Sequence, residues 1–113
     1  HFDAARGRVT AAFRGSDDAA RSAVPGIVLI DLDTQQPVPI NYGLYTATER
    51  DENGVPTKSV LRIPDWADAR GKRIRALAMV NTEVRATLDL QAASGWRQAL
   101  AGWGRWLGMS GLA

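Results

Sequence analysis

The chain lacks cysteine altogether and has a single histidine, His1. The absence of cysteine excludes disulfide bonds, thiolate catalysis and cysteine-ligated zinc. With one histidine, the residue sets of Ser–His nucleophiles and of conventional zinc sites are also missing. We therefore expect a protein that is not an enzyme and that holds no metal or cofactor.

Long apolar runs and a strong charge imbalance are missing too. No stretch approaches the roughly 20 apolar residues of a membrane-spanning helix, and no signal peptide is visible. The net charge is only +2, from 14 basic and 12 acidic residues. The basic residues are scattered among the acidic ones, so we expect no nucleic-acid partner. Because the chain begins with His1 rather than Met, we expect a processed or truncated start and favour a periplasmic, secreted or virion-associated location.

Most of the sequence alternates apolar and polar residues, the period of a half-buried strand. Turn residues such as Pro25-Gly26, Asn53-Gly54 and Asn81 separate the alternating stretches. Six short strands at near-regular spacing favour an all-β, antiparallel β-sandwich formed by residues 1–91. The predicted strands are residues 8–14, 26–33, 38–49, 57–63, 72–80 and 83–90.

The register of the first predicted hairpin follows from its turn. Asn53-Gly54 is a strong signal for a two-residue turn, because both residue types tolerate a positive φ. This turn pairs Thr46 with Leu61 and Leu44 with Ile63 on the inner face. On the outer face it pairs Glu49 with Lys58, which are oppositely charged, and Tyr45 with Arg62.

The second predicted hairpin needs a three-residue loop, Asn81-Thr82-Glu83. That loop pairs Ala76 with Leu88, Ala78 with Ala86 and Val80 with Val84, whereas a two-residue loop sets Val80 opposite the charged Glu83. The outward face then carries Leu77 and Met79. We expect Ile27 and Leu29 of the strand at 26–33 to face outward as well. They share a strand face with the polar residues Asp31 and Asp33, whereas Val28, Ile30 and Leu32 lie on the opposite face.

Several turn motifs resemble those of bacterial transthyretin-like and immunoglobulin-like sandwich domains. They are "GRV", "VPGIVLIDLDTQQPVP" and "TERDENGVPTKSVLRIPDWADARGKRIRALAMV", within roughly residues 7–90. The sequence departs from the pattern at Ile74, where such domains often carry Tyr. The resemblance implies the fold and a role in adhesion, scaffolding or partner docking, and it implies no particular activity.

The C-terminal residues 92–113 hold three of the four tryptophans. At helical period they form an apolar stripe, which predicts an amphipathic helix that begins near Ser94. Gly102 and Gly104 weaken such a helix by about 1 kcal/mol each relative to Ala, so packing must stabilise it. Its stripe residues are Trp96, Ala99, Leu100, Trp103, Trp106 and Leu107.

Three surfaces compete to bury this stripe: the domain's own outer sheet face, a protein partner or second subunit, and a membrane interface. We expect a non-enzymatic structural or protein-interaction domain of a surface, secretion or virion assembly. Its predicted interaction surface is Trp96, Leu100, Trp103, Trp106 and Leu107 of the helix with Leu77 and Met79 of the sheet.

Two alternatives remain: a small-ligand or carbohydrate-binding module that uses exposed tryptophans, and a peripheral membrane-binding module. Trp66 is the other tryptophan that the ligand alternative requires. We expect Trp66 to plug one end of the sandwich, and we expect Asp31 and Asp33 to lie on a solvated strand face.

Overall fold

The computed structural model describes residues 1–14, 18–69, 71–91 and 95–98 of the chain. Strands dominate these residues, and three short helices connect them. In chain order the elements are β1 (Phe2–Asp3), β2 (Arg8–Ala12), α1 (Asp18–Arg21), β3 (Pro25–Asp31), β4 (Gln36–Pro37), α2 (Tyr42–Tyr45), β5 (Thr46–Arg50), β6 (Pro56–Arg62), α3 (Trp66–Ala69), β7 (Ile74–Val80), β8 (Glu83–Asp89) and β9 (Arg97–Gln98).

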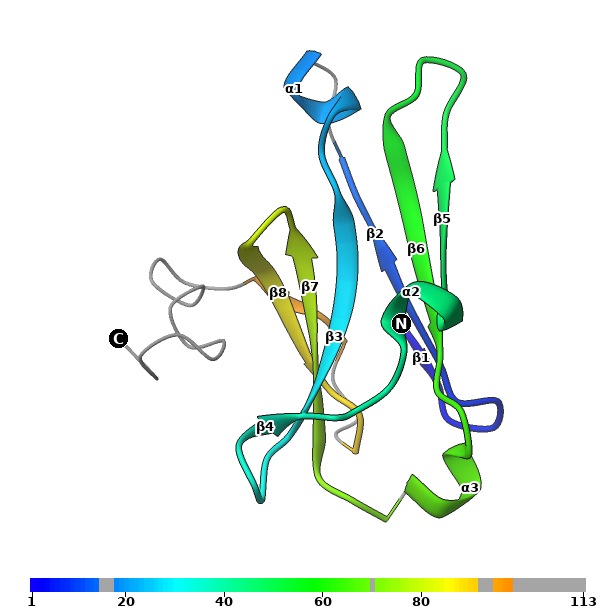
Figure 1. Cartoon of the computed structure of the whole chain (residues 1–113), viewed down its shortest axis with the longest axis vertical. Helices are drawn as coiled ribbons and strands as arrows, with labels where there is room; N and C mark the ends of the chain where they lie inside the picture. Colours follow the sequence, from blue (N-terminus) through cyan, green and yellow to red (C-terminus); the bar gives the residue numbers. More distant parts are fainter. Residues whose placement is uncertain (15–17, 70, 92–94, 99–113) are drawn as a thin grey trace.

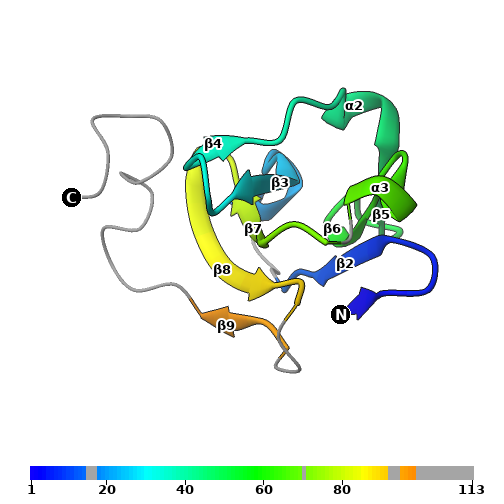
Figure 2. The ribbon, with the colours of Figure 1, turned by 90° about the horizontal axis from the view of Figure 1, so that it is seen from below.

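The strands form two antiparallel sheets. Sheet A has the order β1-β2-β6-β5, and sheet B has the order β4-β3-β7-β8-β9. The two sheets lie face to face, with β3 in contact with β5 and β6 of the opposite sheet (Figures 1 and 2). This arrangement is compatible with a β-sandwich.

The main core lies between the sheets and takes alternate residues from the strands that border it. Its members are all at most 6% exposed: Val9, Ala11, Ile27, Leu29, Leu61, Ile63, Ile74, Ala76, Ala78, Leu88 and Leu90. The one buried polar residue among the described residues is Ser59, whose hydroxyl lies 2.9 Å from that of Thr48. The Thr46 hydroxyl is buried as well and has no hydrogen-bond partner, and the other buried side chains of the described residues are apolar.

Five of the six predicted strands are confirmed, whereas the prediction of a strand over residues 38–49 is wrong in its first half. The chain there leaves β4 in sheet B and crosses to β5 in sheet A through the helical turn α2. Asn41 caps that turn, because its side chain accepts a hydrogen bond from the Leu44 amide. Leu44 is 70% exposed and makes no pair with Ile63.

Tyr42 explains why the sequence of the crossover shows the apolar–polar alternation of a strand. Its hydroxyl donates to the carbonyl of Val38 at 2.6 Å and also lies 3.2 Å from that of Leu29. The ring packs against the main core from α2. Burial raises the pKa of Tyr42 above its ordinary value, although the hydrogen bond to Leu29 acts in the opposite direction. Apolar alternation in this segment therefore marks contacts of a crossover with the core rather than a strand.

The predicted register of the β5–β6 hairpin is confirmed within β5, whereas the predicted pair Tyr45–Arg62 is not formed, because Tyr45 belongs to α2. Thr46 pairs with Leu61 and Glu49 with Lys58, whose charged groups are 3.4 Å apart. The turn itself is longer than two residues, because the register shifts between Glu49 and Arg50. The Asp51 carboxylate accepts hydrogen bonds from the amides of Asn53 and Val55 and stabilises this longer loop.

Trp66 closes one end of the two-sheet structure, as the sequence predicts. Its indole N–H donates to the Ala4 carbonyl at 2.7 Å, and its ring meets Phe2 edge-on at a centroid distance of 5.1 Å. The loop between β1 and β2 approaches the ring closely at Gly7, which has a φ of +66°. A Cβ atom at Gly7 would lie 2.5 Å from Trp66 Cγ. Only glycine fits both the conformation and the space.

We expect Gly7→Ala to lower the free energy of unfolding by at least about 2 kcal/mol, through backbone strain and the clash with Trp66. Chemical denaturation measures this change. Gly71→Ala is the matched control, because a Cβ at Gly71 meets no atom within 4 Å, and we expect a change within about 0.5 kcal/mol. Equal effects of the two substitutions would contradict the role given to Gly7.

Candidate interaction surface

The outer face of sheet B is shaped by a bulge in the β7–β8 hairpin. The predicted pairs Ala76–Leu88 and Ala78–Ala86 are confirmed, but Met79 pairs with Val84 and Val80 with Glu83. The loop therefore has two residues, Asn81 and Thr82, and the prediction of a three-residue loop is wrong. Arg85 is the extra residue, since it has no partner in this register.

Asn81 fixes this short loop. Its φ of +56° lies in the left-handed region, which asparagine tolerates. Its side-chain oxygen accepts from the Val24 amide at 3.0 Å, and its own amide donates to the Val24 carbonyl at 2.8 Å. The loop is thereby attached to the start of β3, which pairs with the end of β7. The bulge absorbs the resulting difference in length between β7 and β8.

The bulge transfers Val84 to the outer face. A one-residue shift of register reverses the side of the sheet to which a strand residue points. Val84 accordingly packs with Leu77 and Ile30, separate from the core between the sheets. The sequence predicts Leu77 and Met79 on this outer face, and Met79 is packed against the same cluster.

The sequence analysis assigns the residues of β3 to the wrong faces of sheet B. Ile27 and Leu29 belong to the core between the sheets, whereas Val28 and Ile30 face outward. Four consecutive apolar residues fit either phase, and the polar references were Asp31, at the end of the strand, and Asp33, which lies beyond it. The Asp31 carboxylate accepts hydrogen bonds from the amides of Asp33 and Thr34 and caps the turn after the strand. Its polarity therefore says nothing about the solvated face of β3.

Cross-strand pairing arranges the outer face in three rows. One row contains Gly26, Met79 and Val84, the next contains Val28, Leu77 and Thr87, and the third contains Ile30, Arg75 and Asp89. We call the apolar members the outer cluster: Val28, Ile30, Leu77, Met79 and Val84.

Three members of the outer cluster are almost fully buried. Ile30 is 2%, Leu77 0% and Val84 4% exposed, and Val28 and Met79 are partly buried against them. The solvated face of an antiparallel sheet normally carries polar residues. A second buried apolar cluster on the far side of sheet B is instead typical of a face that contacts another surface.

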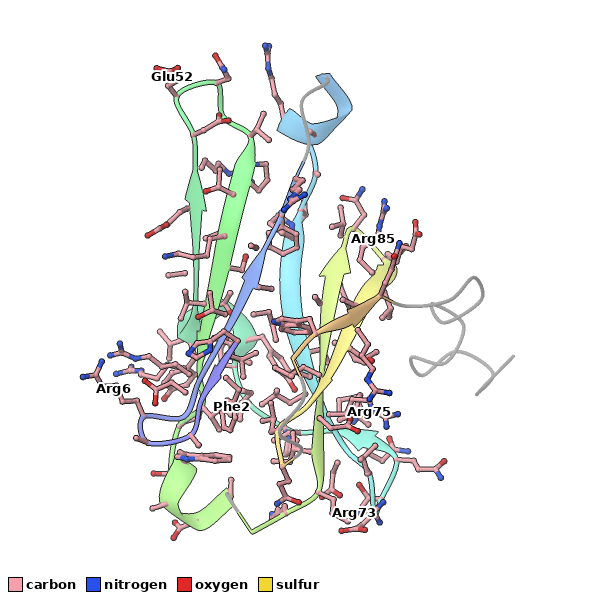
Figure 3. All side chains as sticks on the ribbon, turned by 180° about the vertical axis from the view of Figure 1, so that it is seen from behind. Phe2, Arg6, Glu52, Arg73, Arg75 and Arg85 are labelled. Carbon is pink, nitrogen blue, oxygen red and sulfur yellow. The ribbon has the colours of Figure 1, made fainter. Side chains whose placement is uncertain are left out.

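An ion pair borders the outer cluster. Arg75 Nε donates to Asp89 Oδ1 at 2.6 Å, and Arg75 Nη2 donates to Asp89 Oδ2 at 3.3 Å. The hydrogen bonds from Arg75 are the main cause that lowers the pKa of Asp89, while partial desolvation opposes them and the charges of Arg97 and Arg73 add to them. Arg73 and Arg75 lie toward the start of β7, and Arg85 lies toward the β7–β8 turn (Figure 3). The outer cluster thus has charged borders.

Trp96, the first residue of the predicted stripe, packs toward the core between the sheets. Its indole N–H donates to the Thr10 carbonyl of β2 at 2.8 Å, and its ring contacts the main core. Arg97 and Gln98 then pair with Thr87 and Ala86 as β9. The predicted helix is therefore wrong at residues 97–98, because edge pairing with β8 takes their backbone groups. The remaining stripe residues Leu100, Trp103, Trp106 and Leu107 lie outside the described residues.

Neither a cluster of metal ligands nor a membrane-spanning helix is found in the described parts of the chain. No group of three or more His, Asp or Glu side chains lies close enough to hold a metal ion there. Within the same residues, no helix is long and apolar enough to span a bilayer.

The chain has no significant match among protein-family models, curated proteins or solved structures. The resemblance to transthyretin-like and immunoglobulin-like domains therefore stays a prediction.

We expect Asp89→Asn to lower the free energy of unfolding at pH 7 by about 0.5–1 kcal/mol, because it weakens a partly exposed ion pair. The pKa of Asp89 is lowered in the folded state, so this stabilisation is present at neutral pH and is lost as the pH falls through the folded pKa. Urea denaturation from pH 7 to acid should show the curves of the two proteins converging.

Asp33→Asn serves as the control for this prediction. It breaks the ion pair with Arg73, in which both side chains are more than half exposed, and we expect a smaller loss at pH 7. A constant difference between Asp89→Asn and the parent chain at all pH values would contradict the assignment.

Proposed function

We propose that the chain is a non-enzymatic structural or protein-interaction domain. In this proposal it is a β-sandwich of immunoglobulin or transthyretin type that carries a C-terminal amphipathic segment. Its contact surface combines the outer cluster of sheet B with the stripe residues that follow β9. The partner is another protein or a second copy of this chain, within a surface, secretion or virion assembly.

The outer cluster is the observation that carries the proposal. Five apolar side chains lie on the face of sheet B that points away from sheet A, and none of them belongs to the main core. Burial of one such side chain contributes about 1.5–3 kcal/mol. A domain that needed only its main core would gain solubility from polar residues at these positions.

The charged borders fit an interface as well. Protein interfaces typically have an apolar centre and a polar rim. Arg75 and Asp89 occupy the third row of the outer face, next to Ile30, and Arg97 lies opposite Thr87 in the second. Because Arg75 and Asp89 neutralise each other, this rim favours an apolar partner with few charges over a strongly acidic one.

The described tryptophans support neither the ligand-binding nor the membrane-binding alternative. The indole N–H groups of Trp66 and Trp96 both donate to backbone carbonyls of the same chain, at Ala4 and Thr10. Both rings also contact the main core. A stacking platform for sugars needs a free ring face, and these two side chains serve the fold instead.

The proposal is tested by the mass of the protein in solution. We expect the full chain to self-associate with increasing concentration and a chain that ends at Gln98 to stay monomeric, where each mass from static light scattering is expressed relative to the monomer mass of the same chain. β9 and Trp96 stay in the shortened chain because they belong to the sheets. Far-UV circular dichroism should still show a β-sheet protein. A chain that lacks only residues 108–113 is the control, since it keeps every stripe residue, and its mass should match that of the full chain.

A full-length variant covers the case in which the shortened chain does not fold. Trp103→Ser combined with Trp106→Ser should lower the mass in the same way, because it removes most of the apolar surface of the stripe. An unchanged mass in both the shortened chain and this variant would contradict the proposed function.

A further inference from the structure

We propose that Arg8 and Arg62, with Arg6 beside them, form a second contact site, which binds an extended acidic segment of a partner protein. The site lies on the outer face of sheet A, so it is on the opposite side of the domain from the outer cluster of sheet B. The inference goes beyond the proposed function, because it assigns a further surface and the chemistry of the partner that fits it.

Arg8 and Arg62 lie directly opposite each other in the β2–β6 ladder. Both side chains are exposed, whereas the next residue of each strand is buried in the main core, so both arginines point to the outer face of sheet A. The Ile63 amide donates to the Gly7 carbonyl. Because hydrogen-bonded and non-hydrogen-bonded pairs alternate, Arg8 and Arg62 form a non-hydrogen-bonded pair, with Cα atoms about 4.5 Å apart. Two cations at directly opposed positions destabilise a sheet.

The charges of this pair are not compensated by a carboxylate in the described parts of the chain. Asp3 lies opposite Arg8 on the other side, in β1. Its carboxylate accepts hydrogen bonds from the amides of Ala5 and Arg6 and makes no ion pair with Arg8. Other basic side chains do have a carboxylate oxygen 2.6–3.6 Å away: Lys58, Arg73, Arg75 and Arg85. The repulsion between Arg8 and Arg62 therefore favours an anionic group from outside.

Arg6 adds a third exposed guanidinium group. It belongs to the turn between β1 and β2, and its side chain points away from the two sheets (Figure 3). The next residue, Gly7, fixes this turn through its positive φ and its contact with Trp66. Asp65 and Asp68 are exposed at the same end of the domain, and neither makes an ion pair with the three arginines. A partner carboxylate thus meets guanidinium groups that can still bind it with two hydrogen bonds.

An uncharged row lies next to the arginines on the same face. Val60, two residues before Arg62, has Thr10 and Ala47 as its neighbours on β2 and β5. The Arg62 guanidinium itself lies 5.6 Å from the centre of the Tyr45 ring, a contact that orients it. Two residues along a strand span about 7 Å, and side chains two apart in an extended segment have the same spacing. The site therefore fits a carboxylate followed by an apolar side chain two residues away.

The small extent of the site favours a protein segment over a nucleic acid or an anionic membrane. Nucleic-acid sites present a stripe of basic residues along one face, and sites for anionic lipids typically have about 4–8 Lys and Arg residues together. Here three arginines lie beside an apolar row, and Lys58 on the same face is already paired with Glu49. The net charge of the chain is only +2, so no long-range field adds to the attraction.

A titration of the ¹⁵N-labelled full chain with a short peptide tests the inference. The probe is Ser-Glu-Ser-Val-Ser-Glu-Ser, whose two Glu side chains and Val side chain point to one side when the peptide is extended. We expect saturable shifts of the amide signals of Arg8, Val60 and Arg62, and unchanged signals for Leu77 and Met79 of sheet B. The same peptide with Gln in place of Glu should bind more weakly by about tenfold or more.

Two double variants of equal charge separate the site from the net charge. Arg8→Gln combined with Arg62→Gln should weaken peptide binding by about tenfold or more. Arg73→Gln combined with Arg85→Gln is the matched control, because it removes the same charge from arginines that are paired with carboxylates. Its effect on the affinity should stay within about twofold in 0.15 M salt, where distant exposed charges are screened. Equal weakening by both double variants would overturn the inference.

Thermal unfolding separates binding from a role in folding. Removal of two opposed like charges relieves their repulsion, so Arg8→Gln combined with Arg62→Gln should keep or raise the unfolding temperature. A lowered unfolding temperature with unchanged peptide affinity would overturn the inference, because the arginines would then serve the fold. The absence of saturable shifts with the peptide, or shifts only with oligothymidylate or phosphatidylserine vesicles, would overturn it as well.

Discussion

Asn81 attaches the β7–β8 turn to the start of β3 through two hydrogen bonds with Val24, and the organisation of sheet B follows from that attachment. The two-residue loop leaves β8 one residue too long for β7, and Arg85 bulges out of the ladder. On the C-terminal side of the bulge, Ala86 and Leu88 face the main core. On its N-terminal side, the alternation of inward and outward residues is reversed, so Val84 points outward. The turn thereby adds Val84 to the outer cluster.

The two apolar clusters are stabilised in different ways. Side chains at the margins close the main core, and each combines apolar contact with a hydrogen bond to a backbone carbonyl. Trp66 bonds to Ala4, Trp96 to Thr10 and Tyr42 to Val38. Two of these bonds connect segments far apart in the sequence, because 62 positions separate Trp66 from Ala4 and 86 separate Trp96 from Thr10. The outer cluster has no such closing residue among the described residues, and this difference is why we assign it to the contact surface.

The sequence predicts those parts of the fold in which two independent signals agree. In the β5–β6 hairpin, charge pairing of Glu49 with Lys58 and the inward-facing pair Thr46–Leu61 specify one register, and the structure has it. In β3 the phase signals were Asp31 and Asp33, which belong to the turn at the end of the strand, so the predicted faces were reversed. Leu77 and Met79 of the candidate surface were predictable, because β7 alternates clearly. Val84 was not, because periodicity cannot reveal a bulge that depends on the contact between Asn81 and Val24.

The sequence predicts the C-terminal stripe as one unit, but its first residue packs against the main core. Trp96 is attached to β2 and the main core, so it does not belong to the outer cluster. The spacing of Leu100, Trp103 and Leu107 still places these three side chains on one helical face. Gly102 and Gly104 make an isolated helix at this position unfavourable by about 1 kcal/mol each. A helix here therefore depends on contact with another surface, in keeping with the place of these residues in the proposed contact surface.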